Sequence, residues 1–139
     1  MHGEHFSEQE LACHHCGRNE CTQELVDALE AFRAAAGNVP VIVDDAYRCA
    51  EHNRAIGGVP NSRHVLGQAA DIRITGLTGR QLYAIARQVP AIHGIGVNDY
   101  EEYIHVDVRP VPARWCYEKS GRQTAWYEAP PASPAGEAA

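Results

Sequence analysis

Three side chains in the 139-residue sequence have the chemistry of a zinc site, namely His64, Asp71 and His105. Zinc in proteins binds neutral imidazole, carboxylate or thiolate groups, and a catalytic site keeps three protein ligands and leaves one position for water. Gly67 allows a tight chain reversal between the first two of these residues. Sets of two histidines and one carboxylate suit several metals. Spacing alone therefore leaves open a metal site or three unrelated polar residues.

Two short strands are predicted to carry two of these side chains. In segments 70–74 and 103–109, apolar and polar residues alternate, which is typical of half-buried strands. The alternation places Asp71 on the polar side of the first segment, and His105 and Asp107 on the polar side of the second. If the two strands lie side by side, Asp71 and His105 come together.

Further helices and strands are predicted around this pair. An apolar stripe at helical spacing predicts an amphipathic helix from Thr22 to Ala36. Thr78 and Gln81 have the capping-box pattern that begins a helix. The remaining expected elements are strands at 39–44 and 94–97 and a helical segment at 51–56. Helices and short strands are mixed rather than strictly alternating, which favours the α+β class.

The composition is typical of one globular domain, with 45% hydrophobic and 22% charged residues. A net charge of -6 argues against a nucleic-acid partner bound through phosphate contacts. No apolar run is long enough to span a membrane, and the start lacks the pattern of a signal peptide, so we expect cytoplasmic synthesis. We predict one domain over residues 1–128, a disordered Pro-rich tail over 129–139, and a monomer.

Cysteines form a second group of interest near the start of the chain. Cys13, Cys16 and Cys21 lie close together in the sequence, with two histidines between the first two. Cysteine and histidine are the usual ligands of structural zinc. A single CxxC pair also fits a local disulfide or buried free thiols, and the total of five cysteines leaves at least one unpaired in a monomer. All three interpretations remain open.

Three segments resemble one known family. The run SRHVLGQAAD at 62–71 resembles the SxHxxGxAxD signature of the zinc D-Ala-D-Ala carboxypeptidase family, which also includes cell-wall endopeptidases. The run YIHVDVR at 103–109 resembles the motif that carries the third ligand, and AYRC with HN at 46–53 resembles an upstream GYR…HN segment. The likeness runs from about residue 6 to residue 109 and is greatest to the short, single-domain branch found in phage and bacterial genomes.

The resemblance implies a fold and an activity. The expected fold is α+β, a small antiparallel sheet flanked by helices, as in the hedgehog/DD-peptidase fold. The expected site holds Zn²⁺ on His64, Asp71 and His105, and the expected reaction is hydrolysis of a peptide bond in peptidoglycan stem peptides of the bacterial cell wall. Carboxypeptidase and endolysin-type endopeptidase action share this chemistry and stay open. The alternative is a catalytically inactive, zinc-stabilised module that binds peptidoglycan or belongs to a phage particle.

The resemblance also implies a general base. In many relatives this residue lies three positions before the last histidine ligand, which here is Glu102. Glu101 is an adjacent competitor, and Asp107 is a third candidate because it shares a strand face with His105. Asp107 could instead orient an imidazole. The resemblance favours Glu102 as the base, and the distance from the proton that the base takes decides between the three.

Two residues are implied to contact substrate. Arg48 matches the family arginine that binds the substrate carbonyl oxygen or the developing oxyanion, a role that suits a fixed guanidinium. Its alternative is a salt bridge to Asp44 or Asp45. Ser62 matches the first position of the signature, where it would hydrogen-bond substrate or a ligand. Its alternative is an ordinary turn serine.

Overall fold

The computed structural model describes residues 3–124, so the tail predicted over 129–139 lies outside the described residues. The helices are α1 (Gln23–Ala35), α2 (Ala50–Ala55) and α3 (Gly79–Ala86). The strands are β1 (Ile42–Asp45), β2 (Ala69–Arg73), β3 (Gly94–Asn98), β4 (Tyr103–Asp107), β5 (Ala113–Tyr117) and β6 (Gln123–Thr124). Within the described part of the chain, no helix has the length and apolar character needed to cross a membrane.

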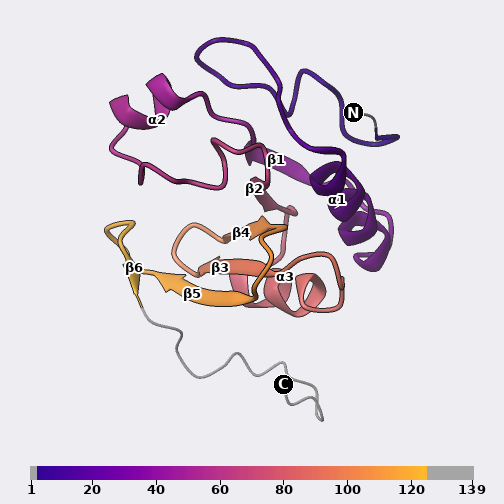
Figure 1. Ribbon diagram of the computed structural model, residues 1–139. Helices are drawn as coiled ribbons and strands as arrows, with labels where there is room; N and C mark the ends of the chain where they lie inside the picture. The colour runs from indigo at the N-terminus through magenta and orange to yellow at the C-terminus, as the bar shows by residue number, and fades with distance from the viewer. Residues whose placement is uncertain (1–2, 125–139) are drawn as a thin grey trace.

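The strands form one mixed sheet in the order β1-β2-β4-β3-β5-β6 (Figure 1). The α+β class is confirmed, but the prediction of an antiparallel sheet is wrong for one pair, because β3 and β5 are parallel. The other neighbours are antiparallel. The parallel pair arises because the chain reverses after β4 and joins the free edge of β3. A strand that runs opposite to β4 must run in the same direction as β3.

One face of the sheet packs into the hydrophobic core. Buried strand residues alternate with the polar ones, and they join the apolar sides of α1 and α3 in one cluster. The largest fully buried members of this cluster are Phe32, Leu11, Leu25, Leu29, Ile72, Leu82, Ile95 and Ile104. Burying a side chain of this size stabilises the fold by about 1.5–3 kcal/mol. The core thus stabilises one face of the sheet, and the polar residues of β2 and β4 lie on the other.

The helices begin where the sequence predicts. At α1, the side chain of Thr22 accepts a hydrogen bond from the N–H of Leu25. At α3, both bonds of the capping box between Thr78 and Gln81 are present. Helix α2 begins at Ala50, one residue before the predicted segment, and its N-cap is Cys49, whose sulfur accepts a hydrogen bond from the N–H of His52. Figure 1 shows α2 apart from the other two helices, close to the segment that leads into β2.

The first described residues form turns that lie against the segments around Tyr47 and Gly67. The Phe6 and Leu11 side chains are buried and anchor this segment in the core. Its backbone reaches the loops directly, because Tyr47 N–H donates to Leu11 O at 3.2 Å. Gly67 has φ +72, and a Cβ there would overlap the backbone of Glu20. The close approach of these two segments therefore requires glycine.

Candidate metal centre and active site

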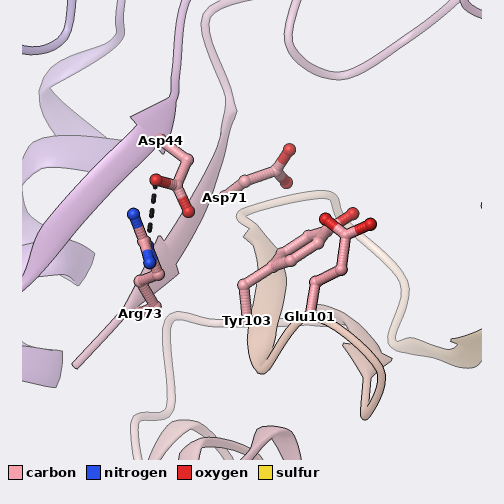
Figure 2. A pocket seen from close by; sticks show the side chains of 5 residues that line it. All are labelled: Asp44, Asp71, Arg73, Glu101 and Tyr103. Carbon is pink, nitrogen blue, oxygen red and sulfur yellow. Dashed lines mark hydrogen bonds and ion pairs between the residues drawn. The ribbon is translucent and has the colours of Figure 1, made fainter. Parts of the chain in front are cut away.

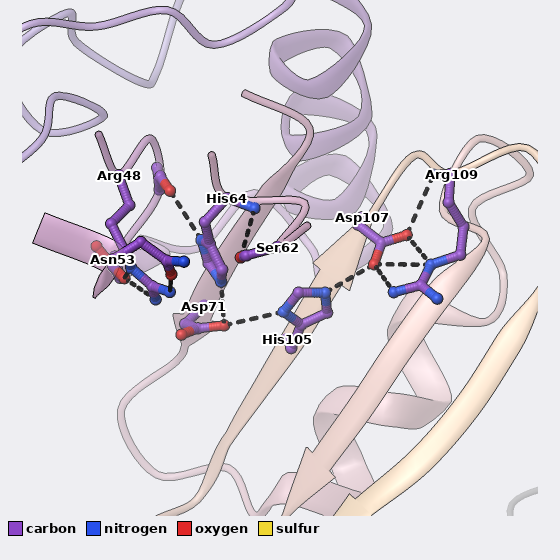
Figure 3. Close-up of polar contacts among 10 residues, drawn as sticks. Arg48, Asn53, Ser62, His64, Asp71, His105, Asp107 and Arg109 are labelled. Atoms are coloured by element: carbon purple, nitrogen blue, oxygen red, sulfur yellow. Dashed lines mark hydrogen bonds and ion pairs between the residues drawn. The ribbon is translucent and has the colours of Figure 1, made fainter. Parts of the chain in front are cut away.

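The sheet register brings the three predicted metal ligands together (Figure 3). Asp71 of β2 lies directly opposite His105 of β4, and His64 comes from the loop before β2. Asp71 Oδ1 lies 3.3 Å from His64 Nε2 and 3.3 Å from His105 Nδ1. One donor atom from each residue falls within 4.8 Å of the others.

This donor set fits a zinc ion. Asp71 Oδ1 is buried and has no hydrogen-bond partner among the described residues, and such a group costs free energy unless something satisfies it. Tetrahedral zinc holds neighbouring nitrogen and oxygen ligands about 3.3 Å apart, given bonds of about 2.0–2.1 Å. The observed separations of 3.3 Å match that spacing without rearrangement.

Both imidazole rings are held in the orientation that a metal requires. His64 Nδ1 lies 2.8 Å from the carbonyl oxygen of Ala46, which can only accept a hydrogen bond. His105 Nε2 lies 2.7 Å from Oδ2 of Asp107. Each ring therefore uses one nitrogen as a donor and presents the other toward Asp71. Fixing the ring and its tautomer in this way strengthens metal binding.

The charges around the triad favour a bound cation. Burial alone would raise the pKa of Asp71, but the imidazoles of His64 and His105 hold that pKa well below its usual range. Burial would lower the pKa of His105, but Asp107 and Asp71 outweigh it and raise that pKa. The pocket thus stabilises positive charge at its centre, which a metal ion supplies in place of a proton.

Asp107 is buried, and its carboxylate contacts both His105 and Arg109. Its side chain has no exposed surface, and Arg109 contacts both carboxylate oxygens, with Nε 2.9 Å from Oδ1 and Nη2 2.7 Å from Oδ2. The guanidinium carbon of Arg109 lies 4.9 Å from the centre of the Trp115 ring. Of the two roles predicted for Asp107, these contacts favour orienting His105 over taking a proton from water.

Two glycines of β3 leave room for this arrangement. Gly94 pairs with Asp107 and Gly96 pairs with His105 across the β3–β4 ladder. A Cβ at Gly94 would overlap the Asp107 carboxylate, and a Cβ at Gly96 would overlap the indole of Trp115. In the sequence, both glycines are recognisable only as part of a predicted strand. In the structure they permit the contacts that hold His105.

We expect Gly94→Ala to loosen the metal centre. The added methyl group must displace Asp107, so His105 loses its fixed partner and zinc affinity falls by about 10- to 100-fold. Overpacking also destabilises the fold by about 1–3 kcal/mol. Zinc competition titrations and thermal unfolding measure the two effects. Ile95→Val is the control, because it destabilises the opposite face of the same strand by about 0.5–1.5 kcal/mol and should leave zinc affinity unchanged. Equal zinc affinity in Gly94→Ala and wild type would contradict the role of Gly94.

Arg48 is held at the edge of the metal centre by two partners. Its Nη2 lies 2.6 Å from Asp45 Oδ2, and its Nη1 lies 2.8 Å from Asn53 Oδ1. Asn53 is buried and donates to the carbonyl oxygen of Val59. The salt bridge that sequence analysis left open thus forms with Asp45. Arg48 still lines the cleft that contains the triad, so the bridge fixes its guanidinium there.

Ser62 acts within its own loop. Its hydroxyl oxygen accepts a hydrogen bond from the backbone N–H of His64 at 3.1 Å, and its side chain is buried. This bond shapes the turn that presents the His64 ring. Ser62 also lines the cleft, so a substrate contact stays a prediction.

The two glutamates before β4 point to different places. Glu102 has a left-handed backbone, with φ +53, and its carboxylate accepts a hydrogen bond from the N–H of Gly79 at 2.6 Å, at the start of α3. Glu101 instead lines a pocket of about 410 Å³ together with Asp71 and Tyr103 (Figure 2). Among the described residues that line this pocket or the main cleft, Glu102 does not occur. Glu101 therefore shares a pocket with Asp71, whereas the Glu102 carboxylate is bound at the start of α3.

A cleft of about 770 Å³ opens over the triad. Its charged lining is unbalanced, because Asp71 is its only acidic residue among those described, against four arginines. The arginines are Arg48, Arg63, Arg109 and Arg122, and the aromatic lining residues are Tyr103, Trp115 and Tyr117. Burial and the nearby Asp71 carboxylate raise the pKa of Tyr103 to about 12, so its hydroxyl stays protonated and can donate a hydrogen bond.

Comparison with known proteins agrees with this geometry. Residues 4–107 match the model of the peptidase M15 family, so the chain belongs to that family. Over 84 residues, which make up 56% of this chain, it is 32% identical to a zinc D-Ala-D-Ala carboxypeptidase of Streptomyces albus G. The match covers 31% of the relative, so the chain spans about a third of that protein's length. The family is one of peptidases and the relative is named as a zinc enzyme, and both agree with a donor set that fits Zn²⁺.

Proposed function

We propose that the protein hydrolyses a peptide bond in peptidoglycan stem peptides with zinc held by His64, Asp71 and His105. The observation that carries the proposal is the unsatisfied Oδ1 of Asp71, which lies 3.3 Å from one nitrogen of each histidine. Membership of the peptidase M15 family supports it, and so does the name of the Streptomyces relative.

The side chains around the triad have distinct tasks. A zinc ion bound there would polarise the scissile carbonyl and activate the attacking water. Arg48, fixed by Asp45 and Asn53, binds the carbonyl oxygen as it gains negative charge. Glu101 takes a proton from the attacking water and passes it to the leaving amine. This assignment moves the base by one residue from the sequence-based choice of Glu102.

The lining of the cleft indicates an anionic substrate. Arg48, Arg109 and Arg122 pair with Asp45, Asp107 and Glu118, whereas Arg63 contacts the neutral Gln68. Arg63 is therefore the lining arginine best placed to attract a carboxylate group of a peptide. Stem peptides carry such groups at their ends and side chains. The protein would accordingly act at the bacterial cell wall, either as a D-Ala-D-Ala carboxypeptidase or as an endolysin-type endopeptidase of phage origin. The more detailed likeness to the hedgehog/DD-peptidase fold is part of the same proposal.

Digestion of purified muropeptides tests the proposal. Zinc-loaded protein is incubated with monomeric and cross-linked muropeptides, and the products are identified by mass spectrometry. Release of terminal D-Ala from monomers indicates a carboxypeptidase, and cleavage of cross-links or of internal stem bonds indicates an endopeptidase. If no product forms while the protein cosediments with peptidoglycan, the inactive binding module is correct and the proposed hydrolysis is wrong.

We expect Arg48→Lys to lower kcat by about 10²- to 10³-fold, the usual cost of losing an oxyanion contact. Lysine cannot contact Asp45 and Asn53 together and still reach the carbonyl oxygen, because it lacks the planar fork of arginine. Arg54→Lys is the matched control, since Arg54 lies on α2 and is exposed. Zinc content should stay constant in both variants. An unchanged kcat in Arg48→Lys would rule out the oxyanion role.

A further inference from the structure

A second cluster of metal-binding side chains lies outside the active site. Cys13 and Cys16 belong to the N-terminal segment, and Cys49 is the N-cap of α2. Their sulfur atoms all lie within 4.8 Å of one another. Cys13 and Cys49 are buried and Cys16 is exposed, and all three are free thiols. The sequence shows the CxxC pair but gives no indication that Cys49, which follows 33 residues after Cys16, completes the group.

We propose that Cys13, Cys16 and Cys49 bind a structural zinc ion, with His15 as the fourth ligand. Three thiolates and one imidazole are a usual donor set for structural zinc. Zinc–sulfur bonds of about 2.3 Å in a tetrahedron place the sulfurs about 3.8 Å apart. The three sulfurs are thus within about 1 Å of the separation that the metal needs.

Backbone N–H groups already point at the sulfur atoms. The N–H groups of His15 and Cys49 each lie 3.4 Å from Cys13 Sγ, and that of His52 lies 3.4 Å from Cys49 Sγ. Hydrogen bonds of this kind stabilise a thiolate more than a thiol, because the thiolate is the stronger acceptor. A buried thiol with no other function does not need several donors.

His15 is placed to complete the set. Its Nδ1 lies 3.6 Å from Cys49 Sγ, and its ring stacks on that of His52 at 5.5 Å. Gly17 follows the CxxC pair with φ +79, and its N–H donates to Cys13 O at 2.9 Å. This closed turn folds the segment back so that both cysteines and His15 face Cys49.

The site would connect the N-terminal segment to the active site. Cys49 directly follows Arg48, whose position the proposed reaction requires. The N-terminal segment contains no helix or strand within its described residues, so hydrogen bonds and a few buried side chains are all that hold it in place. A metal cross-link between this segment and the start of α2 would fix the backbone that carries Arg48.

Metal content tests the proposal directly. Purified, reduced wild-type protein should contain two zinc ions per chain, as measured by mass spectrometry of the elements. Cys16→Ser and Cys49→Ser should each contain one, and Asp71→Asn should also contain one. The double variant Cys16→Ser with Asp71→Asn should contain none. Cys21→Ser is the matched control and should contain two, since Cys21 is a buried cysteine of the same region that lies outside the cluster.

Cobalt substitution identifies the ligands and does not depend on activity. Co²⁺-loaded wild type and Asp71→Asn should show thiolate-to-cobalt charge-transfer absorption, and Cys16→Ser should show it weakened. Cys16 is exposed, so this variant should fold even if Cys49→Ser does not. A single zinc in the wild type without the charge-transfer band would overturn the proposal. So would a mass 2 Da below that of the fully reduced chain, which reports a disulfide in place of the metal.

Discussion

Asp71→Asn is expected to remove zinc from the active site and to lower muropeptide hydrolysis by at least about 10³-fold. Metal polarisation contributes several kcal/mol to such reactions, and each 1.36 kcal/mol is a factor of ten in rate. The substitution preserves the shape of the side chain but removes the charge that lies 3.3 Å from both imidazoles. Zinc stoichiometry, hydrolysis rate and circular dichroism together separate loss of metal from loss of fold.

Asp44→Asn provides the matched control for this experiment. Asp44 lines the pocket next to Asp71, but it pairs with Arg73 at a half-exposed position. Exposed pairs of this kind contribute only about 0–1 kcal/mol, so zinc content and rate should stay close to those of the wild type. If Asp71→Asn keeps both zinc and activity, the metal centre lies elsewhere and the proposed function is wrong.

The second large effect is expected from the general base. Glu101→Gln should lower kcat by about 10²- to 10⁴-fold, the usual contribution of a positioned base, and should leave zinc content unchanged. Glu102→Gln should have little effect, because an amide oxygen can still accept the hydrogen bond from Gly79 at the start of α3. The pair is a strict comparison, since the two residues are adjacent and receive the same substitution.

The pH profile adds a readout that a structural role would not change. The acidic limb of kcat/KM reports the ionisation of the base in the free enzyme, so this limb should be lost in Glu101→Gln and kept in Glu102→Gln. The reverse result would show that Glu102 leaves Gly79 during the reaction and acts as the base. In that case the family pattern, and not the geometry described above, identifies the base.

The meeting of Asp71 and His105 was predictable because strand alternation has a strict period of two, whereas the full ligand set with His64 came from the family resemblance. Asp71 and His105 fall on the polar sides of their segments, and one antiparallel pairing suffices to bring them together. The base could not be predicted in this way, because residues 101 and 102 lie in the turn before β4, where strand alternation does not apply. The family pattern selected Glu102. The left-handed backbone at residue 102, which turns its side chain toward α3, has no signal in the sequence.

Strands β5 and β6 were not predicted, so the cleft-lining residues that they carry were not predicted either. Residues 113–117 are mostly half-exposed, so they show no clean alternation of apolar and polar residues. Trp115 of β5 nevertheless packs 5.0 Å from the His105 ring. Its contact depends on the space left by Gly96, a long-range relation that residue types alone do not encode.

The pairing of Asp71 with His105 gives the metal a part in folding itself. A slip of β2 against β4 by one residue would turn Asp71 to the core face and separate it from both histidines. Only the correct alignment can bind zinc, so the free energy of binding is added to that alignment and to no competitor. Zinc binding would then stabilise the correct register of the sheet over misaligned ones, and a misaligned chain would not bind the ion.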